Sequence, residues 1–256
     1  MSTFPALHLA PVTRSKNVAL LFLAGLWSVA EVWSEWQQLA AKRGYGSWAL
    51  TLKPKTRATS LKDYALYVLD FLKEPEGRGT NPVIIGHSMA GLVTQMVAEH
   101  YNLPGVVLLN SAAPAGISNF SLPLALRIFP YLKSILGNEL FMPSLRDSKA
   151  LLFNNLGNVT AEVMSAYHQE LVPDSGKAAR EIILGTVAVK HTYCPTLILG
   201  GSQDRILPTR IQRKLATKYS SAIYLEVDHG HVTMLEPSSD LVLHAILDWT
   251  EKLPPL

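Results

Sequence analysis

The chain has 256 residues, of which 48% are hydrophobic and 17% charged, and its formal net charge at pH 7 is +3. This length suits one α/β domain with an inserted subdomain, and the low charge excludes a disordered or fibrous chain. The densest basic run, residues 52–57 (LKPKTR), contains no aromatic side chain. We therefore expect a solvated loop there and no nucleic-acid partner.

Cysteine usage and the early apolar segments indicate the compartment. Cys194 is the single cysteine, so no disulfide forms within the chain, and no Cys/His spacing typical of a metal site is present. Residues 1–16 lack the pattern of a signal peptide, and the apolar run 18–27 is shorter than the roughly 20 residues that span a bilayer. We expect a cytoplasmic protein without an integral membrane span.

Six apolar runs predict strands. Four are continuously apolar, which is typical of a parallel sheet covered on both faces, whereas residues 47–52 are weaker and residues 222–227 alternate like an edge strand. The four continuous runs are residues 18–24, 82–86, 105–110 and 195–200.

Helical patterns alternate with these strands. They cover residues 28–44, 60–74 with Ser60 as N-cap, 90–101 and 241–253. Alternating strands and helices predict an α/β fold with a doubly wound, mostly parallel sheet.

One long segment interrupts this rhythm. Residues 118–190 contain helix-like stretches and no convincing strand. The sequence thus predicts an α/β core at residues 1–117 and 191–256, and a helical lid at 118–190 over the carboxyl ends of the strands, where such sheets bind ligands.

A serine lies in a turn of small residues, residues 83–92 (VIIGHSMAGL). Gly86 precedes Ser88 by two positions and Ala90 follows by two, which is the spacing of a nucleophile elbow between a strand and a helix. The sharp reversal strains the central residue and requires small neighbours, so that the serine hydroxyl is exposed above the sheet. We expect the neighbouring His87 to point away from the pocket. Tight packing alone is the alternative reading.

A nucleophilic serine requires a base and an acid that orients it, and after such an elbow the acid precedes the base in the chain. Asp204 follows the strand run 195–200, and Asp228 is the rival acid, although it is close in sequence to the base. His229 and His231 are both candidates for the base. A His-Gly-His metal clamp is disfavoured because no third ligand is evident.

The oxyanion of an acyl-transfer reaction requires two backbone donors. We expect these to be the amide of Met89, which follows the serine, and the amide of Leu26, in the loop after the first buried strand.

Together these segments resemble the α/β-hydrolase superfamily, and more narrowly its lysophospholipase-like and monoacylglycerol-lipase-like bacterial esterases. The resemblance rests on LFLAGLWSVAEVW, PVIIGHSMAGLVTQ, CPTLILGGSQDRILP and DHGHVTMLEP. It implies that Ser88 is the nucleophile, Asp204 the acid and His231 the base, since GHVTMLE matches the Gly-His-x-x-x-x-Glu motif of such relatives. Two loops depart from the family: Ala24 precedes Gly25 where relatives carry His-Gly, and residues 51–60 (TLKPKTRATS) lack the usual glycine and histidine.

We therefore expect a serine hydrolase that cleaves a carboxylic ester or thioester through an acyl-enzyme, without a metal or organic cofactor. The apolar lid residues favour a small-molecule substrate with an apolar acyl or ring group, although they would equally form a lid core. The alternatives are non-hydrolytic chemistry on the same fold, such as C–C cleavage or acyl transfer, and a ligand-binding protein. The chain is expected to be a monomer or homodimer.

Overall fold

A seven-stranded sheet forms the centre of the molecule in the computed structural model, which describes residues 6–12, 16–74, 81–153 and 159–254. The strand order is β1-β3-β2-β4-β5-β8-β9, and every neighbouring pair is parallel except β1 with β3. The strands are β1 (Ala6–Leu9), β2 (Leu20–Leu23), β3 (Ser47–Leu50), β4 (Val83–His87), β5 (Val106–Leu109), β8 (Thr196–Gly201) and β9 (Ala222–Val227). This confirms the predicted α/β class and mostly parallel sheet.

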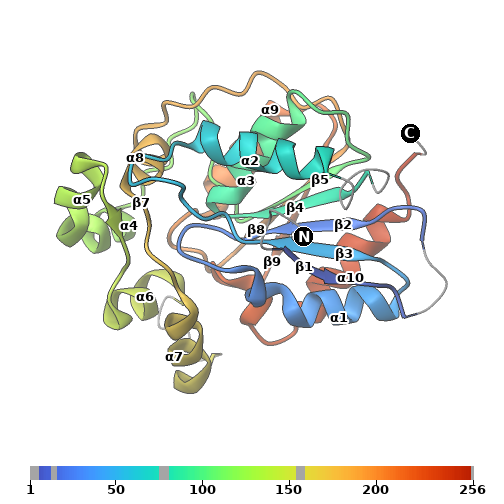
Figure 1. The fold of residues 1–256 in the computed structure, drawn as a ribbon, viewed down its shortest axis with the longest axis horizontal. Helices are drawn as coiled ribbons and strands as arrows, with labels where there is room; N and C mark the ends of the chain where they lie inside the picture. Colours follow the sequence, from blue (N-terminus) through green and yellow to red (C-terminus); the bar gives the residue numbers. More distant parts are fainter. Residues whose placement is uncertain (1–5, 13–15, 75–80, 154–158, 255–256) are drawn as a thin grey trace.

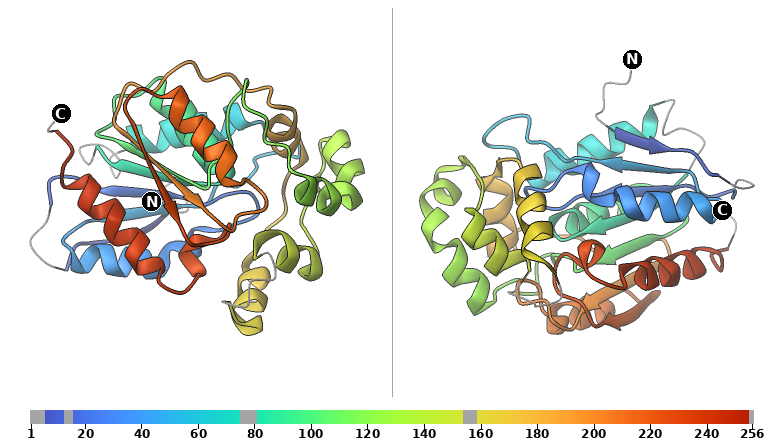
Figure 2. Two further views of the ribbon diagram at one scale, coloured as in Figure 1. Left: turned by 180° about the vertical axis from the view of Figure 1, so that it is seen from behind. Right: turned by 90° about the horizontal axis from the view of Figure 1, so that it is seen from below.

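Helices cover both faces of the sheet (Figures 1 and 2). One layer holds α2 (Leu61–Lys73), α3 (Met89–Ala98) and α9 (Thr209–Lys218), and the other holds α1 (Ser34–Lys42) and α10 (Ser239–Thr250). Because helices pack on both sides, β2, β4, β5 and β8 are buried along their whole length. A 3-10 turn, η1 (Ala30–Trp33), precedes α1 and stacks Trp33 on Phe22 at a ring-centroid distance of 5.1 Å.

Local capping fixes the start of α2. The Ser60 hydroxyl accepts from the Asp63 amide, and the Asp63 carboxylate accepts from the Ser60 amide in return. This capping box satisfies amides at the helix end that have no partner within the helix. The predicted N-cap is therefore confirmed.

The chain between β5 and β8 forms a separate group of helices beyond the ends of the parallel strands (Figure 1). They are α4 (Leu122–Ile128), η2 (Phe129–Tyr131), α5 (Leu132–Gly137), α6 (Leu145–Leu152), α7 (Ala161–Glu170) and α8 (Gly176–Leu184). The expectation that this segment holds no strand is wrong, since β6 (Leu140–Phe141) pairs with β7 (Asp174–Ser175). Each has only two residues, which is too short to leave a periodic signal.

Two further elements were not predicted. Strand β1 pairs antiparallel at the sheet edge and is half-exposed, and α9 buries few of its side chains. The alternating run 222–227 is the edge strand β9, as expected. A short 3-10 turn, η3 (Thr233–Leu235), follows the last strand. Within the described residues, no helix is both long and apolar enough to cross a bilayer.

Candidate active site

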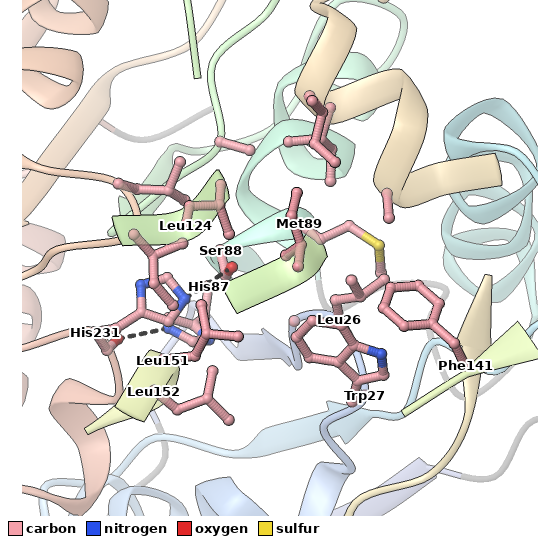
Figure 3. Close-up of a pocket in the computed structure, with 18 of the residues that line it drawn as sticks. Leu26, Trp27, His87, Ser88, Met89, Leu124, Phe141, Leu151, Leu152 and His231 are labelled. Atoms are coloured by element: carbon pink, nitrogen blue, oxygen red, sulfur yellow. Dashed lines mark hydrogen bonds between the residues drawn. The ribbon is translucent and has the colours of Figure 1, made fainter. Parts of the chain in front are cut away.

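Ser88 lies at the sharp turn between β4 and α3. Its backbone has φ 55° and ψ −120°, in the left-handed half of conformational space that non-glycine residues seldom adopt. Three hydrogen bonds hold it there: its amide donates to Leu109 O at 3.1 Å, and its carbonyl accepts from the amides of Gly91 and Ala112, each at 3.0 Å. The side chain lies at the N-terminal end of α3 and lines a cavity (Figure 3).

Close backbone approach explains the small residues around the turn. A Cβ added to Gly86 would lie 2.6 Å from the carbonyl oxygen of Ala90 and 2.2 Å from the Thr94 hydroxyl oxygen. A Cβ added to Gly25 would lie 2.9 Å from the Ser88 Cβ. Both positions therefore require glycine, the first to let β4 reverse into α3 and the second to let the loop after β2 approach the serine.

The structure brings Ser88, His231 and Asp204 together from three separate loops. His231 Nε2 lies 3.0 Å from Ser88 Oγ, and His231 Nδ1 lies 2.8 Å from Asp204 Oδ2. His231 and Asp204 are both buried, at 2% and 3% exposure. Asp204 Oδ1 also accepts the amides of Ile206 and Leu207, which fixes the carboxylate toward the imidazole.

The rival candidates lie elsewhere. His229 Nε2 bonds Pro237 O at 2.9 Å, and Asp228 is exposed, where it accepts from the Ser202 hydroxyl and from Nε2 of the Gln203 side chain. In the part of the chain that the structure describes, no group of three or more His, Cys, Asp or Glu side chains is arranged to hold a metal ion.

Two polar residues that the sequence reasoning missed hold the loop of His231. The Asn110 side-chain amide donates to Gly230 O and His231 O, both at 2.9 Å, and its oxygen accepts from the Gly201 amide. Both oxygens of Glu236 accept from the Gly230 amide. Glu236 is the glutamate of the GHVTMLE motif, so its motif position was the signal of this role.

His87 does not point away from the site, which corrects the expectation from the sequence. Its ring lines the cavity, and its Nε2 bonds the His231 carbonyl oxygen at 2.8 Å. Burial and the neighbouring His231 lower the pKa of His87 to about 3, so the ring is neutral at physiological pH. A neutral imidazole adds no repulsive charge beside His231.

The loop after β2 carries Leu26, one of the two predicted oxyanion donors. Leu26 lines the same cavity as Met89 and Ser88 (Figure 3), and within the described chain neither the Leu26 nor the Met89 amide donates to a protein acceptor. The next residue, Trp27, has φ 66°, and hydrogen bonds hold both its backbone amide and its carbonyl. Its amide donates to Asp174 Oδ2 at 3.0 Å, and its carbonyl accepts from the Val172 amide at 2.9 Å.

Asp174 is a buried carboxylate that no local sequence pattern marked. It is 1% exposed and accepts from the Tyr64 hydroxyl, the Ser175 amide and the Trp27 amide. Burial raises the pKa of Asp174 despite these donors. Asp174 thereby joins β7 of the inserted segment to the loop that holds Leu26.

The cavity over Ser88 is almost entirely apolar. The cavity volume is about 70 Å³. The inserted helices and strands supply half of the residues of its wall, among them Leu124, Ile128, Ile135, Phe141, Leu151, Leu152, Ile182 and Ile183. The basic loop 53–57 contributes no side chain to this wall.

This arrangement is suited to nucleophilic attack on a carbonyl. A neutral His231 with Nδ1–H held by Asp204 presents a free Nε2 that can take the proton of Ser88 Oγ. The strained turn places the Ser88 hydroxyl at the N-terminal end of α3. The amides of Leu26 and Met89, which have no acceptor among the described residues, can donate to a developing oxyanion.

The comparisons with known proteins agree with this geometry. The model of the alpha/beta hydrolase family matches residues 20–244. Similar solved structures include MenH from S. aureus (TM-score 0.75, 18% identity, 98% of this chain and 99% of that one) and a thermophilic esterase from Thermogutta terrifontis (0.72, 18%, 96% and 93%). A third is the monoacylglycerol lipase of Paleococcus ferrophilus (0.71, 19%, 97% and 98%).

At these identities the structural likeness establishes the fold alone. No curated protein matches the chain by sequence. The family match, in contrast, covers most of the chain and includes Ser88, Asp204 and His231. The chain therefore belongs to the alpha/beta hydrolase family.

Proposed function

We propose that the protein is a serine hydrolase that cleaves a carboxylic ester or thioester with an apolar acyl or ring group. The observation that carries this proposal is the hydrogen-bonded series Ser88–His231–Asp204 at the floor of an apolar cavity. Membership of the alpha/beta hydrolase family, together with esterase and lipase folds among its structural neighbours, supports hydrolase activity.

In the proposed mechanism, His231 takes the proton of Ser88 as Oγ attacks the substrate carbonyl carbon. The amides of Leu26 and Met89 donate to the resulting oxyanion, and His231 then protonates the leaving alcohol or thiol. Water, deprotonated by the same histidine, attacks the acyl-enzyme and releases the acid. Asp204 keeps Nδ1 protonated and stabilises the imidazolium in both half-reactions.

The inserted segment acts in this proposal as a lid, residues 118–190, on a core of residues 1–117 and 191–256. Its leucine and isoleucine side chains exclude water from the acyl-enzyme and bind the apolar group of the substrate. Contacts with the core hold it: the Ser175 hydroxyl donates to Thr59 O, and the Leu61 amide donates to Glu181.

A panel of esters and thioesters with acyl chains of two to twelve carbons tests the proposal. We expect hydrolysis by the wild type, with a preference for apolar chains, and loss of turnover by about 10⁴-fold or more in Ser88→Ala. Turnover that survives Ser88→Ala would contradict it, as would saturable binding of these esters without turnover by the folded wild type.

A further inference from the structure

A surface groove adjoins the cavity over Ser88 and shares part of its wall. Leu124 and Leu151 on the lid helices and Ile206 after β8 line both spaces. The groove has a volume of about 260 Å³. A substrate whose acyl or ring group fills the cavity therefore has room for its remaining part in this groove.

Among the described residues, two arginines line this groove and no carboxylate does. Arg127 is on α4 of the lid, whereas Arg205 directly follows Asp204. The two segments are joined where the Ser121 hydroxyl, at the start of α4, donates to Arg205 O at 2.9 Å. Neither guanidinium forms an ion pair or hydrogen bond with another described residue.

The acidic side chain near Arg127 is that of Asp147, and it does not line the groove. Asp147 accepts from the Tyr131 and Ser144 hydroxyls. The Tyr131 hydrogen bond is the largest cause of its lowered pKa, and Arg127 and Arg146 add smaller electrostatic contributions. Arg127 thus keeps its hydrogen-bond donors available for a ligand.

The rest of the groove is apolar. Exposed Leu122 and Leu126 line it with Ala150 and the residues shared with the cavity. Guanidinium donors recognise carboxylate and phosphate oxygens in a planar, bidentate geometry. The groove, with two arginines that have no carboxylate partner among the described residues and an otherwise apolar wall, therefore suits an amphiphilic ligand with an anionic end.

We propose that the natural substrate carries an anionic group, a carboxylate or a phosphate, on the part that lies outside the cavity, and that Arg127 and Arg205 bind this group. This inference rests on the proposed ester hydrolysis, since it concerns the substrate of the same serine. It assigns the two arginines to substrate selection and gives them no part in the bond cleavage itself.

Matched pairs of esters test the inference. The first pair is 4-(octanoyloxy)benzoate and its neutral isostere 4-(octanoyloxy)benzamide, and the second is 1-octanoylglycerol 3-phosphate and 1-octanoylglycerol. The ratio of kcat/KM between the anionic and the neutral member is measured for the wild type, Arg127→Gln and Arg205→Gln. Arg146→Gln is the control, because it removes a positive charge from the same lid without lining the groove.

We expect the wild type to favour the anionic member of at least one pair, and that pair identifies the group as carboxylate or phosphate. Each groove variant is expected to lower this ratio about fivefold to tenfold, mainly through KM, whereas Arg146→Gln leaves it within about twofold. Ratios equal in the wild type and both groove variants would overturn the inference, as would an equal loss in Arg146→Gln.

The outcomes also separate this inference from the proposed function. If the neutral esters are hydrolysed in a Ser88-dependent way without any anionic preference, only the assignment of the groove fails. If no ester is hydrolysed, the proposed function fails, and calorimetric binding of the benzoate and benzamide to Ser88→Ala still decides whether the groove selects the anion. Equal affinity for the two would overturn it.

Discussion

Replacing Asp174 by asparagine alters, at constant side-chain size, the group that holds the oxyanion loop, which is the loop after β2 that carries the proposed oxyanion donor Leu26. The carboxylate accepts from three groups: Oδ1 from the Tyr64 hydroxyl and the Ser175 amide, and Oδ2 from the Trp27 amide. Asparagine has one acceptor oxygen. If that oxygen faces Tyr64 and Ser175, its NH₂ group faces the Trp27 N–H, and two donors then oppose each other.

The structure sets the magnitude of this change. A buried amide left without an acceptor costs about 1–3 kcal/mol. The neutral amide partly offsets this cost, because burial already raises the pKa of Asp174 and so disfavours its charge. We expect the free energy of unfolding to fall by about 1–2 kcal/mol. The repelled Trp27 amide moves the adjoining Leu26 amide, and a weakened oxyanion donor lowers kcat by about tenfold to a hundredfold with little change in KM.

Steady-state ester hydrolysis and urea unfolding measure the two effects separately. Tyr64→Phe is the matched control, because it removes one hydrogen bond from Asp174 but leaves the Trp27 contact in place. It is expected to cost about 1 kcal/mol of stability and to keep kcat within about threefold. An Asp174→Asn protein that is destabilised but retains the wild-type kcat would refute the coupling between Asp174 and the oxyanion loop.

Three further predictions concern the serine turn and its histidines. His231→Ala lowers kcat by about 10⁴-fold or more, whereas His229→Ala retains most activity in the same ester assay; the reverse result contradicts the choice of base. Gly86→Ala forces a Cβ to within 2.6 Å of a backbone carbonyl oxygen and should cost about 1–3 kcal/mol in urea unfolding, while Gly137→Ala, whose nearest contact is 3.6 Å, changes stability little. Because the pKa of His87 falls from 6.5 to about 3 on folding, the unfolded chain binds more protons between these values, so stability decreases as pH falls through that window. His87→Gln flattens this dependence; an unchanged pH profile of unfolding contradicts the buried neutral ring.

Much of the fold was predictable because the central strands are continuously apolar. Such runs are typical of a sheet covered on both faces, and the four buried parallel strands overlap them, with β4 and β8 each extending one residue further. Strand β1 has two exposed and two half-exposed residues and depends on pairing with β3, which lies about forty residues later in the chain. A strand that forms because of pairing with a distant strand has little hydrophobic periodicity in its own sequence.

Some residues of the candidate site were likewise predictable from the local sequence, and others were not. Ser88, Asp204 and His231 carry local signals, since Ser88 and Asp204 each follow a buried strand, His231 follows the edge strand β9, and their order matches the family. Asp174 carries none, because its partner Tyr64 is 110 residues away and only the folded chain brings them together. The orientation of His87 was missed for a related reason: it depends on the carbonyl of His231, which reaches it from a distant loop.

Covalent labelling of Ser88 tests the central claim most directly. Wild-type protein treated with a fluorophosphonate is examined by intact mass and peptide mapping, with Ser88→Ala and His231→Ala treated in parallel. We predict a single phosphonyl adduct on Ser88 in the wild type, none in Ser88→Ala, and labelling slowed by several orders of magnitude in His231→Ala. A folded wild type that remains unlabelled, or that carries the adduct on another residue, would contradict the assignment of Ser88 as the nucleophile.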